Sequence, residues 1–217
     1  MYQNPTLAIA FAGVGTPLVL IGIAKWVSEG LTHTPLLAGV APSALPIFIV
    51  SEVFIFLGLF ASYWTMRLSA GDAWPPAGTP TEMNLTLPLI MTVILVSSSL
   101  TYHVAEAKIE KGDRVGFNLW LIISIVLGLT FLYCTFYEYS HLLHVGFGPS
   151  TNAYSTAFYS ITGFHASHVI VGLGVFLSVL IPALFGKTNK YFIFCAGVYW
   201  HFVDVVWFFV ASQVYYW

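Results

Sequence analysis

Long runs of apolar residues, separated by short polar stretches, dominate the pattern of this 217-residue chain. A helix needs about 20 predominantly apolar residues to cross the hydrocarbon core of a bilayer. Because lipid offers the backbone no hydrogen-bond partner, each run of that length must be a helix. The pattern therefore predicts an all-α, polytopic transmembrane helix bundle. The six runs cover residues 6–26, 44–66, 85–107, 117–139, 156–185 and 191–216.

The first run is the weakest of the six, because Gly13, Gly15 and Pro17 lie in its middle. We expect six spans, and five if this first run does not cross. The run has no Lys or Arg before it, unlike a cleaved signal peptide, so we expect it to stay in the mature chain. No internal repeat or soluble domain is visible, and residues 1–217 are interpreted as a single integral membrane domain.

The basic residues orient the predicted helices, because loops rich in Lys and Arg stay in the cytoplasm. With six spans, Arg67 falls on one side of the membrane and the other basic residues fall opposite. The C-terminus is then extracytoplasmic with either five or six spans, whereas the side of the N-terminus depends on the first run. The basic residues predicted on the cytoplasmic side are Lys25, Lys108, Lys111, Arg114, Lys187 and Lys190.

Composition strengthens the membrane prediction. The chain is 58% hydrophobic and only 7% charged, whereas a soluble domain carries roughly 25% charged residues. This excludes a soluble enzyme, a nucleic-acid binder with a basic patch and a disordered module. Cys134 and Cys195 both lie in apolar runs without a partner at metal-ligand spacing, so neither a disulfide framework nor a zinc site is expected.

Ionisable side chains inside the predicted helices are the candidates for function, since each is costly at membrane depth. Glu52 is the most isolated, because no Lys, Arg or His occurs from residue 43 to 66. Desolvation disfavours a carboxylate without a counter-charge. We therefore expect a neutral acid that is either hydrogen-bonded inside the bundle or engaged in proton handling or lipid-headgroup contact. The full set is Glu52, His103, Glu106, Glu138, His165, His168, His201 and Asp204.

Three pairs in this set have a spacing of three residues, which places both members of each pair on one helix face. They are His103 with Glu106, His165 with His168, and His201 with Asp204. His201 and Asp204 are interpreted as a polar pair that locks helices together, with a proton relay as the alternative. His165 and His168 leave a haem or metal site open, for which His103 and His201 could supply further ligands. Hydrogen bonding of these histidines across helices is the favoured interpretation.

The remaining acids and motifs point to no chemistry of their own. Glu138 and Glu106 lie near helix ends and are expected to be structural, with Glu138 close to water. The sequence contains no Gly-rich phosphate loop, no Ser/His/Asp arrangement and no paired-carboxylate pattern. A stand-alone proton or ion transporter and a bis-His haem electron carrier stay open as alternatives. Transporters commonly show paired repeats and broken helices, and neither is visible.

Five short segments carry a resemblance to a known family. They read SEVFIF at 51–56, WPPAG at 74–78, EKGDR at 110–114, FHASHVIVG at 164–172 and YWHFVDVVW at 199–207. In these segments the chain resembles subunit III of the haem–copper respiratory oxidases, the cytochrome c oxidase type, in a bacterial form. Ala166 and Thr135 depart from the usual Gly and Gln of that family. A single run precedes the first segment, where the family has two helices or none.

The resemblance implies a function. The chain would be the non-catalytic accessory subunit of a proton-pumping terminal oxidase in the aerobic respiratory chain, embedded in the bacterial inner membrane. It would pack on subunit I, share the complex with subunit II, bind phospholipid but no nucleic acid, and support proton uptake and stability during turnover. Haem and copper would lie in the partner subunits, leaving this chain without a catalytic residue, metal or cofactor. Relatives in quinol oxidases and nitric oxide reductases share the motifs.

The resemblance also assigns roles to single residues. Glu52 matches the buried glutamate of the family. Structural polar positions are matched by His165, His168, His201 and Asp204, and His103 and Glu138 are assigned to the same structural polar group.

Overall fold

Six helices make up most of the chain in the computed structural model, which describes residues 5–32, 40–80 and 85–216. A short 3-10 turn, Gly71–Ala73, follows the second helix, and a π-helical segment, Ala211–Tyr215, extends the last. These ranges contain no β-strand, so the all-α prediction is confirmed. The helices are α1 Pro5–Thr32, α2 Val40–Ala70, α3 Thr86–Glu110, α4 Arg114–His144, α5 Ala153–Leu184 and α6 Lys190–Val210.

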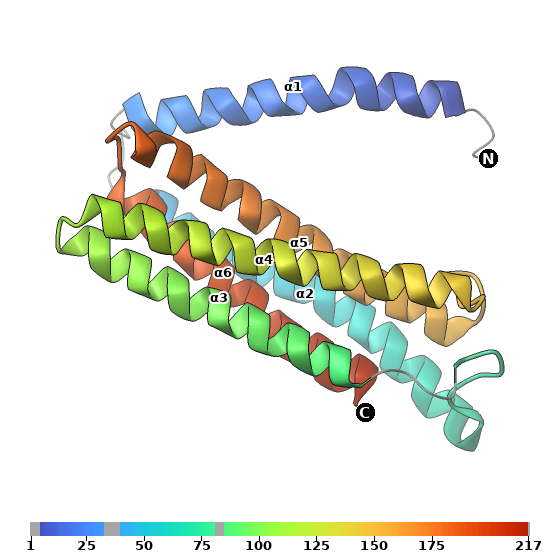
Figure 1. Cartoon of the computed structure of the whole chain (residues 1–217). Helices are drawn as coiled ribbons and strands as arrows, with labels where there is room; N and C mark the ends of the chain where they lie inside the picture. Colours follow the sequence, from blue (N-terminus) through green and yellow to red (C-terminus); the bar gives the residue numbers. More distant parts are fainter. Residues whose placement is uncertain (1–4, 33–39, 81–84, 217) are drawn as a thin grey trace.

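Helices α2 to α6 pack together as one bundle, while α1 lies apart from it and far from α3 (Figure 1). Within the described residues, five helices are long and apolar enough to cross a membrane, one in each of α2 to α6. Helix α1 contributes a shorter apolar stretch, Gly13–Lys25. The five-span alternative therefore fits the described residues, and a sixth crossing stays a prediction.

The two turns that carry most basic residues lie at the same end of the bundle. The α3–α4 turn and the α5–α6 turn both lie at the left of Figure 1, whereas the C-terminal end of α2 and the C-terminus lie at the other end. Each of the two turns contains a glycine with a positive φ, 80° at Gly112 and 76° at Gly186, which ends the preceding helix. The arrangement agrees with the orientation expected from the positive charges.

Helix α4 starts from a charged cap outside the membrane. The Asp113 carboxylate accepts a hydrogen bond from the Gly116 backbone N–H at 2.8 Å, and Lys108 Nζ lies 3.2 Å from its other oxygen. The Gly116 hydrogen bond first, and then Lys108, lower the pKa of Asp113 because both favour the carboxylate. The cap therefore fixes the turn between α3 and α4.

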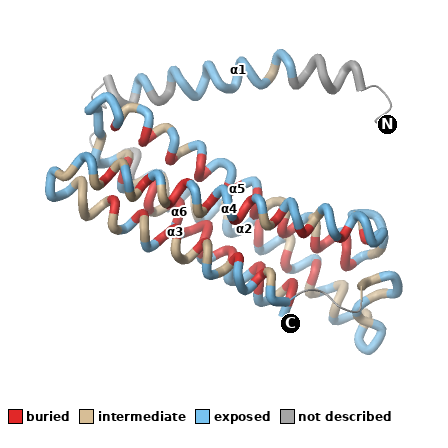
Figure 2. The backbone as a smooth tube through the Cα atoms, in the orientation of Figure 1, coloured by how far each residue is buried: buried red, intermediate tan, exposed pale blue. Residues whose placement is uncertain are grey.

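Burial is concentrated where the helices of the bundle face one another, and their outer surfaces are exposed (Figure 2). Trp200 of α6 is fully buried at the centre. Its ring packs on Phe176 with the ring centroids 4.7 Å apart. Two glycines leave room for it: a Cβ added at Gly172 would lie 2.7 Å from the Trp200 ring, and one at Gly128 would lie 3.0 Å from it. Small residues thus allow α4, α5 and α6 to close around one large aromatic side chain.

The WPPAG segment ties the end of α2 to the start of α5. Trp74 makes edge-on ring contacts with Tyr63 of α2 and Tyr154 of α5. The Asn152 side-chain amide, which precedes α5, donates to Thr79 Oγ1 at 3.0 Å. These contacts hold α2 against α5, the two helices that carry the pair of residues described next.

Candidate functional site

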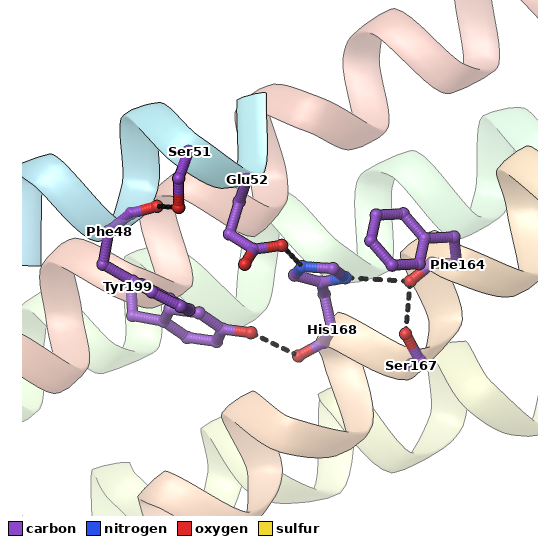
Figure 3. A network of polar contacts seen from close by, with 7 residues as sticks. All are labelled: Phe48, Ser51, Glu52, Phe164, Ser167, His168 and Tyr199. Carbon is purple, nitrogen blue, oxygen red and sulfur yellow. Dashed lines mark hydrogen bonds and ion pairs between the residues drawn. The ribbon is translucent and has the colours of Figure 1, made fainter. Parts of the chain in front are cut away.

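Glu52 of α2 and His168 of α5 meet inside the bundle. His168 Nε2 lies 3.0 Å from Glu52 Oε2, and Nδ1 of the same ring lies 2.9 Å from the Phe164 carbonyl oxygen (Figure 3). The two residues are 116 positions apart in sequence. The expectation that Glu52 has no basic neighbour was wrong, because it considered only its own helix and the base comes from another.

The contacts of His168 restrict where its protons can lie. A carbonyl oxygen only accepts hydrogen bonds, so Nδ1 must carry the proton that faces Phe164. The contact between Nε2 and Oε2 then needs one further proton, which either Glu52 or His168 can hold. The pair is therefore a neutral acid hydrogen-bonded to a neutral imidazole, or a carboxylate paired with an imidazolium. Either form shares a single exchangeable proton.

Aromatic rings enclose this pair on several sides. Phe56, Phe164 and Phe202 all contact the imidazole, with ring centroids 4.6–6.1 Å from it. The side chains of His168 and Glu52 are only 9% and 16% exposed. Tyr199 OH donates to the His168 carbonyl oxygen at 3.3 Å and fixes the backbone behind it. Water is thus largely excluded, and the shared proton has few other acceptors.

A second polar cluster joins α3 to α6 near the middle of both helices. The Ser99 hydroxyl donates to Asp204 Oδ2 and lies 3.3 Å from His201 Nδ1. His201 Nδ1 is 4.0 Å from the same carboxylate oxygen. The predicted proximity of His201 and Asp204 on one face is present. The pair also reaches a neighbouring helix through Ser99, which the sequence reasoning did not single out.

The two glutamates expected to be structural lie in different surroundings. Glu138 accepts a hydrogen bond from Tyr215 OH at 2.7 Å and is buried. The expectation that water is close to Glu138 was wrong, because its carboxyl is buried against Tyr215 of the π-helical segment that continues α6. Glu106 lies 3.9 Å from His103, whose side chain is largely exposed, and it packs close to Gly197 of α6.

His165 does not converge with His168, although the two share a helix. The ring of His165 lies between Phe131 of α4 and Trp207 of α6. Both of its nitrogens are buried without a hydrogen-bond partner among the described residues. Within the same part of the chain, no three His, Cys, Asp or Glu side chains come close enough together to hold a metal ion. The metal alternative therefore finds no set of three ligands there.

Two residues that complete these contacts were missed from sequence. Ser99 belongs to a run of three serines in an otherwise apolar helix, and that interruption was a visible signal. Tyr215 lies in the tyrosine-rich C-terminal segment, where nothing marked it as the partner of a buried acid.

Comparisons with known proteins agree on one family. A family model described as "Cytochrome c oxidase subunit III" matches residues 24–217. The "Cytochrome c oxidase subunit 3" of Synechocystis sp. is 43% identical over 173 residues, which cover 78% of this chain and 72% of that protein. The "Probable cytochrome c oxidase subunit 3" of Nocardia farcinica is 41% identical, with 78% and 84% covered. The "Cytochrome c oxidase subunit 3" of Mycosarcoma maydis is 33% identical, with 100% of this chain and 83% of that protein covered.

Proposed function

The chain belongs to the cytochrome c oxidase subunit III family, and from this membership we propose that it is the accessory subunit of a proton-pumping terminal oxidase. It is a membrane protein of the respiratory chain and part of an oxidoreductase complex. The observation that carries the proposal is the family match over residues 24–217, which includes both members of the Glu52–His168 pair.

In this proposal the chain has no redox centre of its own. Haem and copper belong to the partner subunits, and subunit I is the main contact with subunit II in the same complex. The chain resides in the bacterial inner membrane with the α3–α4 and α5–α6 turns in the cytoplasm. The clustered basic residues at these turns support that orientation.

The Glu52–His168 pair supports proton uptake rather than performing the reaction. Its two groups hold one shared proton in an aromatic enclosure, and moving that proton between Glu52 and His168 leaves the pair neutral overall in lipid. Because the pair lies on α2 and α5, it also holds α2 against the rest of the bundle. Loss of the pair would therefore shorten the time for which the oxidase stays active before it slowed the oxidase reaction itself.

Phospholipid contact is the other part of the proposed function. Most outward residues of α2 are apolar, and large side chains such as Ile47 and Phe54 are more than half exposed. Val14 and Leu18 of α1 are exposed to a similar extent. Surfaces of this composition match acyl chains, which supports lipid bound between α1 and α2 or around them.

The proposal is tested by comparing the oxidase isolated with this chain and without it. We expect similar initial turnover in both preparations but an earlier loss of activity over successive turnovers without the chain, and recovery when the chain is added back. Unchanged durability without the chain would contradict the supporting role. Immediate loss of the haem absorption together with this chain would contradict the absence of a redox centre.

A further inference from the structure

A polar group of residues lies on the outside of the bundle between α3 and α6. It consists of the exposed His103 of α3 and His201 of α6, with Ser99 and Asp204 buried directly behind them, and we call this group of four residues the α3–α6 seam. The His103 side chain is 76% exposed and the His201 side chain is 49% exposed. His201 and Ser99 lie near the middle of the candidate spans Lys190–Tyr215 and Thr86–Glu110.

Exposure of the His201 imidazole to lipid near the middle of the span is unfavourable, because an imidazole nitrogen without a partner loses its hydrogen bonds to water. Exposed hydroxyls elsewhere on the bundle avoid the problem. Thr130 and Ser167 donate to carbonyl oxygens of their own helices, at 2.8 Å and 2.6 Å. A histidine ring with one nitrogen facing Ser99 still presents its other edge outward.

The buried carboxylate of the seam, Asp204, is also incompletely paired. The Asp204 side chain is only 10% exposed. Its Oδ2 accepts from Ser99, but Oδ1 is buried with no hydrogen-bond partner among the described residues. A buried acceptor without a donor costs free energy, so the cluster is incomplete in this chain alone.

We propose that the α3–α6 seam is the surface on which another oxidase subunit places a transmembrane helix bearing a hydrogen-bonding side chain at mid-membrane depth. This rests on the proposed function, since it names the contact surface of the accessory subunit. Polar side chains are the usual means of joining helices in lipid, where apolar surface gives no preference for protein over acyl chains.

The other faces of the bundle fit lipid better. On α2 the exposed large side chains include Val53, Phe54 and Leu57, and on α4 they include Val126 and Leu129. Helix α1 does not cover the seam, because it lies on the far side of the bundle from α3 (Figure 1). The occupant is therefore expected from another chain.

Photo-crosslinking in the assembled oxidase tests the location. A benzophenone amino acid replaces Leu100, which is exposed on α3 and three residues before His103, so the seam itself is unchanged. Phe54 of α2 and Leu129 of α4 are the matched control positions, with similar exposure. We expect an adduct between position 100 and another oxidase subunit, and lipid adducts from the two controls.

Three other outcomes would contradict either the inference or the proposed function. An adduct of position 100 with lipid alone, or with a second copy of this chain, overturns the inference. A subunit adduct from position 54 or 129 in place of position 100 also overturns it but leaves the proposed function intact. Failure of the chain to co-purify with any oxidase subunit would instead contradict the proposed function.

A second variant tests the polar contact itself. His201→Phe keeps a ring of similar size but removes the nitrogens, and His141→Phe at the exposed end of α4 is the control. We expect the fraction of oxidase that loses this chain in detergent to rise roughly tenfold for His201→Phe, the change that about 1.4 kcal/mol produces. Equal losses for both variants would contradict the inference.

Discussion

Oε2 of Glu52 on α2 lies 3.0 Å from Nε2 of His168 on α5, and the side chains of Phe56 and Phe164 pack against the imidazole. The opposite nitrogen of the imidazole is held by the Phe164 carbonyl oxygen. The pair therefore shares one proton, which lies on Glu52 when the imidazole is neutral. This relationship connects the most isolated acid of the sequence with one of its histidines.

Glu52→Gln is expected to leave assembly and most turnover intact. The Gln amide can donate to His168 Nε2 and keeps the contact between α2 and α5, while it cannot release a proton. We expect a loss of turnover well below tenfold, the factor that about 1.4 kcal/mol in activation free energy would give. Reactivity toward a hydrophobic carbodiimide, which needs a protonated acid, should disappear.

Glu138→Gln serves as the control, because this acid is also buried but contacts Tyr215. That variant should keep the carbodiimide reaction at Glu52. Infrared difference spectra should show a carboxylic-acid band in the unmodified oxidase that is absent in Glu52→Gln. Complete loss of turnover in a fully assembled Glu52→Gln complex would identify Glu52 as an essential proton carrier.

Asp204→Ala is expected to reduce the amount of assembled complex rather than to slow its chemistry. The substitution leaves the buried Ser99 hydroxyl without its acceptor, at a cost of about 1–3 kcal/mol. Quantitative blotting of the complex against the turnover per haem separates the two effects. A normal amount of complex with collapsed turnover would favour the proton-relay alternative for His201 and Asp204.

Gly172→Ala should destabilise the bundle, because the added Cβ would lie 2.7 Å from the buried Trp200 ring. Overpacking of this kind costs about 1–3 kcal/mol. Gly174→Ala is the matched control on the same helix, since a Cβ there meets nothing within 4 Å. Thermal unfolding in detergent should show a lower midpoint for Gly172→Ala alone. Equal midpoints would show that Trp200 can move aside.

The stability that the Asp113 cap gives to α4 should depend on pH only in acidic solution. The Gly116 backbone N–H and Lys108 lower the pKa of Asp113, so its contribution to stability is complete above the ordinary aspartate value of about 3.9. That contribution is lost as the pH falls through the lowered pKa. The Gly116 amide resonance reports this titration, and Lys108→Ala should move its midpoint upward. A midpoint above the ordinary value would contradict the cap.

The helices themselves could be predicted from sequence because a lipid-exposed backbone has no alternative to the helix. Each apolar run from residue 44 onward coincides with a helix to within one residue at either end or lies inside it, and polar or glycine-containing turns such as those at Gly112 and Gly186 separate the helices. Short-range relationships were also accessible. The spacing of His201 and Asp204 correctly placed both on one face.

Contacts between helices could not be predicted, because they depend on which helices are neighbours and how each is rotated. The partners Glu52 and His168 are 116 residues apart, and Glu138 and Tyr215 are 77 residues apart. The spacing of His165 and His168 indicated a shared face. In the structure, the His165 ring instead contacts α4 and α6, whereas the His168 ring contacts Glu52 of α2. One helix packed on three others makes such a division possible.

Purification of the tagged chain in mild detergent, followed by mass spectrometry and a visible spectrum, tests the central claim most directly. We predict that a larger haem-bearing chain co-purifies in a fixed ratio, and that the Soret band follows that chain when the subunits are separated. A Soret band that stays with this chain and is lost in His165 or His168 variants would contradict the account. So would a chain that purifies alone while an oxidase in the same membranes keeps its full complement of subunits.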